Sequence, residues 1–106
     1  MAQVIWAEPA LQDLDRIADY IALDDPLAAR RLVQAVFAKT DLLESFPEMC
    51  PVPHDLPSSR YRHMLVGPLR IFHRIEQDVV YIVYVMRSER DLKLEDLSSR
   101  FPVTGE

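Results

Sequence analysis

The feature that most constrains the fold is a run of apolar residues, VVYIVYVM, at residues 79–86. A strand that is apolar on both faces lies at the centre of a sheet and is covered on each side. Two shorter strand-like runs precede it at residues 61–66 and 69–75, and turn residues separate all three. The pattern predicts an antiparallel three-strand meander with a central, buried last strand.

The middle strand of this meander has two different faces, since alternate side chains point to opposite sides of a sheet. One face carries Leu69, Ile71, His73 and Ile75, and the other carries Arg70, Phe72 and Arg74. We expect the first face to be buried and the second to be at least partly wet. Because the neighbours of His73 are apolar, we interpret it as a hydrogen-bonded structural histidine.

Two amphipathic helices are expected between a short first strand at residues 4–6 and the meander. Pro9 and Pro26 each suit the first turn of a helix, and Asp25 can accept hydrogen bonds from the free amides there. Apolar residues recur at spacings of three and four. They are Leu11, Leu14, Ile17, Ala18 and Ile21, then Ala29, Leu32, Val33, Val36, Phe37, Thr40 and Leu43. The hairpin needs an apolar surface to pack on.

The rest of the chain completes one small α+β domain over residues 1–106. Prolines at 47, 51, 53 and 57 predict an irregular connector between the second helix and the meander. Residues 91–101 could form a short last helix with Leu94, Leu97 and Phe101 inward. We expect the first strand to join the same sheet as the meander, and Asp13, Asp15 and Asp19 to form a solvated helix face.

Charge and composition exclude several classes of function. The net charge is −5, and residues 1–58 hold four Lys/Arg against ten Asp/Glu, so binding driven by nucleic-acid phosphates is not expected. No segment reads as a secretion signal or a membrane span, which predicts a cytoplasmic protein with no membrane partner. The lone Cys50 rules out an internal disulfide, and His54 and His63 lack partners at metal-ligand spacing, so no metal or cofactor is expected.

Three stretches of the chain resemble a known family when they are taken in order. They are VIWAEPALQDLDRIADYIALDDPLAARRLV at residues 4–33, RHMLVGPLRIFHRI at 62–75 and VYVMRSERD at 83–91. The first is similar to the strand and proline-started helices of the RelE/ParE toxin superfamily, and the others are similar to its strand pair and last strand. The resemblance covers about residues 3–92 and is closest to the ParE-like branch.

The resemblance implies one of two activities on the same scaffold. RelE-like members are ribosome-dependent endoribonucleases that cleave messenger RNA, whereas ParE-like members bind and poison DNA gyrase. Cleavage of RNA needs a base, an acid and cationic groups at the phosphate. Here Leu65 stands near the usual arginine of the nuclease branch, no tyrosine follows Tyr84, and Arg87 replaces a common histidine. Glu89 would be a poor base between two arginines.

We therefore expect a non-enzymatic, gyrase-binding toxin of a type II toxin–antitoxin system, with a RelE-like endoribonuclease as the alternative. Its expected antitoxin is ParD-like, with a ribbon-helix-helix DNA-binding half and a tail that folds onto the toxin. Direct sequence-specific binding of nucleic acid by the toxin itself is not expected.

Two surfaces are candidates for these contacts. The proposed target-binding residues are Arg87, Glu89, Arg90 and Asp91, with Arg62, Arg70 and Arg74 as neighbours on the wet sheet face. The alternative is that Arg87, Arg90 and Asp91 only pair with one another at a strand exit. The proposed antitoxin-binding residues are Leu14, Ile17, Ile21, Leu32, Val36 and Tyr61, beside an apolar groove between the helices.

Overall fold

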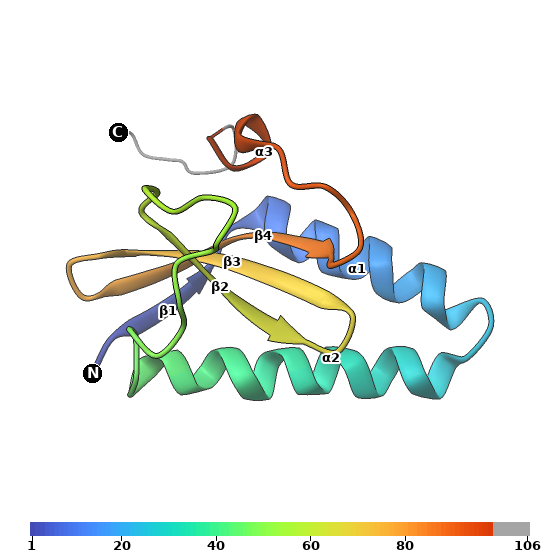
Figure 1. The fold of residues 1–106 in the computed structure, drawn as a ribbon. Coiled ribbons are helices and arrows are strands. Elements are labelled where there is room, and N and C mark those ends of the chain that lie inside the picture. The colour runs from blue at the N-terminus through green and yellow to red at the C-terminus, as the bar shows by residue number, and fades with distance from the viewer. Residues whose placement is uncertain (99–106) are drawn as a thin grey trace.

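The computed structural model describes residues 1–98 and contains one four-stranded sheet with two long helices (Figure 1). In chain order the elements are β1 (Gln3–Trp6), α1 (Glu8–Ala22), α2 (Pro26–Asp41), the 3-10 turn η1 (Leu42–Glu44), β2 (Tyr61–Val66), β3 (Leu69–Glu76), β4 (Val79–Arg87) and α3 (Leu94–Ser98). The strand order is β1-β4-β3-β2, with β1 parallel to β4 and the other pairs antiparallel. The predicted α+β fold is confirmed.

The helical hairpin begins and turns where the sequence predicts. The amide of Ala28 donates to Asp25 Oδ1 at 3.1 Å, so Asp25 caps α2 as expected. In α1 the backbone carbonyl of Ala7 accepts from Ala10 and Leu11 instead of a side-chain cap. Within residues 1–98, no helix has both the length and the apolar character needed to cross a membrane.

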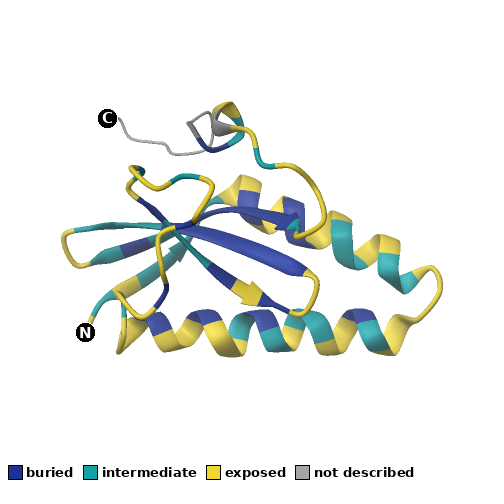
Figure 2. Cartoon of the chain, viewed as in Figure 1, coloured by how far each residue is buried: buried dark blue, intermediate teal, exposed yellow. Residues whose placement is uncertain are grey.

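The main core lies between the sheet and the hairpin, and β4 supplies much of it. Figure 2 colours the cartoon by burial, and the buried positions run along the middle of the sheet and recur at intervals on the two long helices. The buried apolar residues of this main core are Ala10, Leu14, Val36, Leu43, Cys50, Met64, Val66, Leu69, Ile71, Val80, Ile82 and Val85. One predicted stripe residue, Leu11, is exposed instead, while the neighbouring Asp13 is buried.

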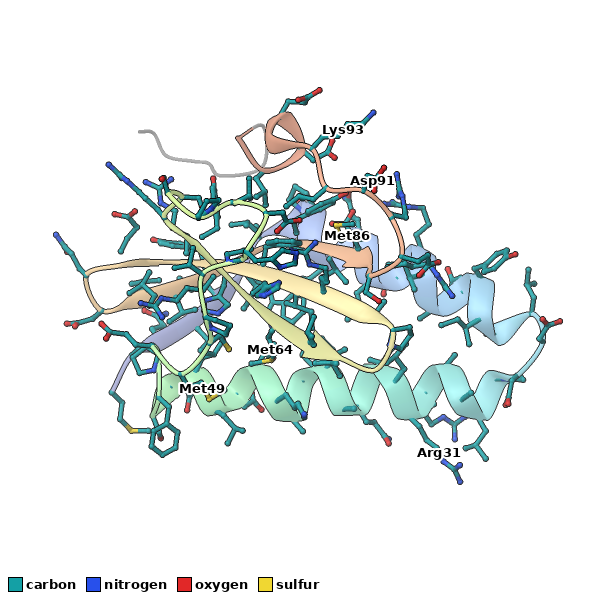
Figure 3. All side chains as sticks on the ribbon, viewed as in Figure 1. Arg31, Met49, Met64, Met86, Asp91 and Lys93 are labelled. Carbon is teal, nitrogen blue, oxygen red and sulfur yellow. The ribbon has the colours of Figure 1, made fainter. Side chains whose placement is uncertain are left out.

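The second face of the sheet is covered as well, so the expectation of a wet face was wrong. Its core contains Tyr61, Phe72, Val83, Tyr84, Met86 and Leu97, with Leu56 and Leu92 packed against it. Leu97 belongs to the predicted last helix, observed at Leu94–Ser98, and is fully buried. Phe101, also predicted to point inward, lies outside the described residues. In Figure 3, Met64 lies on the side of the sheet that faces α2, and Met86 on the side of the segment bearing Asp91.

A register shift in β4 lets one strand serve both cores. Phe72 pairs with Tyr84 while His73 pairs with Ile82, which leaves Val83 as an extra residue. Val83 and Tyr84 therefore both join the second core, whereas Ile82 and Val85 join the first.

His73 is buried as predicted but is not hydrogen-bonded as predicted. The side chain is fully buried, and within the described chain neither Nδ1 nor Nε2 has a hydrogen-bond partner. Burial, then the nearby charges of Arg62 and His63, lower its pKa from 6.5 to about 4. The native state thus holds His73 neutral, because a charged ring there would be poorly solvated.

Acid should destabilise the fold through His73. His73 takes up a proton near pH 6.5 in the unfolded chain but only near pH 4 in the folded chain. Its contribution to the free energy of unfolding is therefore fully present above pH 6.5 and is lost as the pH drops toward 4. The full loss is roughly 3 kcal/mol. We expect urea unfolding monitored by circular dichroism to show this slope in the wild type and a clearly smaller one in His73→Phe. Equal slopes would contradict it.

Candidate functional site

The exit of β4 is a short turn that presents charged side chains to solvent. The amide of Ser88 donates to Pro68 O at 2.7 Å, which ties the exit to the turn between β2 and β3. The amide of Arg90 then donates to Arg87 O at 3.1 Å. Glu89, Arg90 and Asp91 are exposed. The structure therefore brings four of the predicted target-binding residues, Arg87, Glu89, Arg90 and Asp91, to one surface.

Within this turn, Arg87 pairs with Glu89 rather than with Asp91. Arg87 Nε donates to Glu89 Oε2 at 2.9 Å, and the side chain of Glu89 remains 63% exposed. Its own backbone amide and Arg87 lower the pKa of Glu89. Glu89 is therefore a weak base at neutral pH, in agreement with the interpretation of the sequence.

The other three predicted arginines do not extend this surface. Arg62 lies on the first face of the sheet, the face that packs on the hairpin. There its Nη1 donates to Cys50 O at 2.6 Å and to Glu48 O at 3.2 Å. Arg74 lies on the second face and donates to Glu76 Oε2 at 2.6 Å. Arg62 and Arg74 each bind an acceptor of this same chain. The expected cluster of arginines on a wet sheet face therefore does not form.

Arg70 is the most deeply engaged of the three. Its guanidinium makes two parallel bonds to Asp55, at 3.0 and 2.9 Å, and its Nε donates to His63 Nδ1 at 3.2 Å. The guanidinium carbon of Arg70, Cζ, also lies 4.8 Å from the ring centre of Phe72. The hydrogen bond from Arg70 lowers the pKa of Asp55. Only 9% of the Arg70 side chain is exposed, so its role in this structure is to fasten the connector to the sheet.

The histidine and cysteine side chains give little support to other chemistry. Burial raises the pKa of the Cys50 thiol, which keeps it protonated and poorly nucleophilic. Burial first, and Arg70 second, lower the pKa of His63. No three His, Cys, Asp or Glu side chains in the described part of the chain are grouped so that they could hold a metal ion.

The predicted antitoxin-binding residues divide into core and partly exposed positions. Leu14 and Val36 are buried because the apolar stripes of the hairpin pack on the sheet, and Tyr61 of β2 is buried in the second core on the other face. Ile17, Ile21 and Leu32 are half-buried. The structure has no open apolar groove made by all six.

Exposed apolar side chains gather instead near the end of α2. A hollow of about 430 Å³ there is lined by Leu42, Met49, Met64 and Leu65, among others. Met49 and Met64, labelled in Figure 3, lie on the side of the structure that α2 occupies. Leu42, Met49 and Leu65 are 48%, 44% and 59% exposed, and Phe46 nearby is 59% exposed. We refer to Leu42, Phe46, Met49 and Leu65 as the apolar patch.

Sequence reasoning missed Asp13, which is buried rather than part of a solvated face. Strand β1 ends at Trp6, which pairs with Ile82. Beyond Ile82, β4 therefore continues without a neighbouring strand on that side. Asp13 Oδ2 accepts from the amide of Val85 at 3.1 Å and supplies the hydrogen bond that β1 does not. The signal was its spacing, three residues after Ala10 and four before Ile17, which places it on the core face of α1.

Comparison with known proteins decides the family. The model of the ParE toxin of the type II toxin–antitoxin system parDE matches residues 4–92. The chain belongs to this ParE toxin family. It is 33% identical over 91 residues to Toxin RelE2 of Caulobacter vibrioides, covering 85% of this chain and 99% of that protein. It is 35% identical over 77 residues to Putative toxin Y4kP of Sinorhizobium fredii, covering 73% and 79%.

A solved structure agrees on the ParE-like fold. The chromosomal ParDE toxin–antitoxin system of P. aeruginosa contains a chain that matches with a TM-score of 0.72 and 20% identity. The match covers 84% of this chain and 98% of that one. At this identity the similarity concerns the fold, and this ParE-family chain is a type II toxin by its family model.

Replacement of Asp13 should destabilise this toxin. Asp13→Ala leaves the buried amide of Val85 without its acceptor, which costs about 1–3 kcal/mol in the free energy of unfolding. The matched control is Asp15→Ala on the exposed face of the same helix, with an expected change within about 0.5 kcal/mol. Urea unfolding at neutral pH measures both. Equal losses in the two variants would contradict the role assigned to Asp13.

Proposed function

We propose that this ParE-family toxin acts in the cytoplasm by binding DNA gyrase and that a ParD-like antitoxin neutralises it. The observation that carries the gyrase proposal is the chemistry of the β4 exit. It offers the exposed guanidinium of Arg90 and the partly exposed guanidinium of Arg87, beside a carboxylate whose pKa is lowered. Such a surface suits ion pairs with a protein and lacks a poised proton acceptor.

The covered second face of the sheet supports the same proposal. A messenger RNA cleaved on this face would need cationic side chains that are free to meet its phosphates. Arg70 is instead paired with Asp55, and Arg74 is paired with Glu76. Leu97 and Leu56 pack on the apolar core of this face, which includes Phe72. A net charge of −5 further opposes binding of a polyanion.

The antitoxin half of the proposal rests on the family and on the apolar patch. The family is that of the ParE toxin of a type II toxin–antitoxin system, and the similar solved structure is a ParDE toxin–antitoxin system. A ribbon-helix-helix antitoxin with a disordered tail would cover Leu42, Phe46, Met49 and Leu65 as that tail folds. The half-buried Leu32, which lies beside Gly67 two residues after Leu65, would border the contact, whereas Ile17 and, one turn further on, Ile21 lie on α1 toward the β4 exit.

A RelE-like endoribonuclease is the second candidate, because one relative is named RelE2 and because His63, His54 and Asp55 lie near Arg70. In that activity a histidine would move protons while an arginine met the phosphate. The hydrogen bond from Arg70 to His63 Nδ1 occupies the ring nitrogen that would accept a proton. This arrangement favours a fastening role over catalysis.

One pair of assays separates the two candidates. Purified toxin should inhibit supercoiling by gyrase, and it should leave messenger RNA uncut on programmed ribosomes. Arg87→Ala and Arg90→Ala should each weaken gyrase inhibition by about tenfold, since each removes charge-assisted hydrogen bonds.

The control for these variants is Arg31→Ala, which removes an exposed arginine from α2, far from the β4 exit (Figure 3). It should inhibit gyrase as the wild type does, and all variants should unfold at the same urea concentration. Codon-positioned cuts in messenger RNA with gyrase unaffected would refute the gyrase proposal and favour the RelE-like activity.

A further inference from the structure

A small hollow beside the β4 exit contains an arginine that sequence analysis did not connect with it. The hollow has a volume of about 250 Å³ and lies between α1 and the end of β4. Arg16 of α1, Arg87 and Arg90 all line it, and Ile17 and Met86 contribute apolar wall. Arg16 is distant from the other two in sequence and reaches the hollow only because α1 packs along the edge of β4. We call this site the arginine hollow.

Most of the hydrogen-bond donors around the arginine hollow are unused. Each guanidinium carries five N–H donors. Arg16 contacts Asp13 through one terminal nitrogen at 2.9 Å, and its side chain is 70% exposed. Arg87 uses Nε for Glu89, and Arg90 makes no side-chain hydrogen bond or ion pair within residues 1–98. An anion entering the hollow would meet donors from three directions.

The floor of the hollow is fixed by Asp13. Its Oδ1 accepts from Arg16 and its Oδ2 accepts from the amide of Val85, so the carboxylate ties α1 to β4. The charged side chains that line the hollow are three arginines and this single carboxylate, so the lining carries an excess of positive charge. That excess is local, because the whole chain carries −5.

We propose that the arginine hollow receives a carboxylate side chain, aspartate or glutamate, from the protein that this toxin targets. Glu89 already places a carboxylate 2.9 Å from Arg87. Because Glu89 is exposed and exposed ion pairs contribute little to stability, an incoming carboxylate replaces it at small cost. The chain's own glutamate thus acts as a weak competitor for the site.

A carboxylate fits this hollow better than a nucleic-acid phosphate does. The volume accommodates one side chain, and the apolar Ile17 and Met86 suit the methylene stem of a glutamate. A nucleic acid would bring further phosphates toward a chain of net charge −5, which repels them.

The hollow is tested without any partner by nuclear magnetic resonance of the arginine side chains. N-acetylglutamate is titrated into 15N-labelled toxin, with sodium chloride of equal ionic strength and inorganic phosphate as parallel titrations. We expect saturable shifts of the Nε–H signals of Arg16, Arg87 and Arg90 with N-acetylglutamate. Arg90→Ala should weaken this binding by about tenfold, and Glu89→Gln should tighten it.

The variants are chosen so that a folding defect does not imitate a binding defect. Arg90→Ala and Glu89→Gln leave Asp13 and its bonds intact, and Arg30→Ala on α2 is the matched control, which should bind as the wild type does. Shifts no larger than those in sodium chloride would overturn the proposal. Tighter binding of phosphate than of N-acetylglutamate would overturn it as well, since the site would then suit a phosphate.

The part of the inference that concerns the target rests on the proposed function and is measured separately. Glu89→Gln should inhibit gyrase more strongly than the wild type. Arg16→Ala, which also removes the bond to Asp13 Oδ1, should inhibit less when it is assayed well below its thermal midpoint. If the wild type binds N-acetylglutamate but leaves gyrase active, the gyrase proposal fails and the carboxylate site stands. If the wild type inhibits gyrase, and both Glu89→Gln and Arg16→Ala inhibit it as the wild type does, the carboxylate site fails and the gyrase proposal stands.

Discussion

The packing of β4 on both faces is the constraint on which the rest of the structure depends. A strand with Ile82 and Val85 on one side and Tyr84 and Met86 on the other must have an apolar layer on each side. The helical hairpin provides one layer. The connector and the segment that carries Leu97 provide the other, and both are therefore held close to the sheet.

The fold was predictable where periodicity alone decides it. Spacings of three and four identified the hairpin, and alternation between turns identified the strands. The cover of the second face was not predictable in this way, because Arg70 and Arg74 flank Phe72 and give that face a polar pattern. Their guanidinium groups find partners at Asp55 and Glu76, which permits burial that side-chain polarity does not suggest.

The candidate site was predictable in part. A charged sequence directly after a buried strand identified the β4 exit, but the sequence did not assign Arg62 to its correct face. The two-residue turn at Gly67 and Pro68 sets Arg62 opposite His73, so counting back from the turn would have placed both on one face. Arg16 was not predictable, since its place beside Arg87 depends on how α1 crosses the sheet edge.

The hydrogen bond from Val85 to Asp13 also affects how the protein meets other chains. Strand β1 ends early, and an uncovered edge of β4 would offer unpaired amides as a template for a strand from another molecule. A carboxylate carried by a helix takes that place and cannot be extended into a further ladder. At the most apolar strand of the sheet, the amide of Val85 is therefore not available to pair with a strand from another molecule.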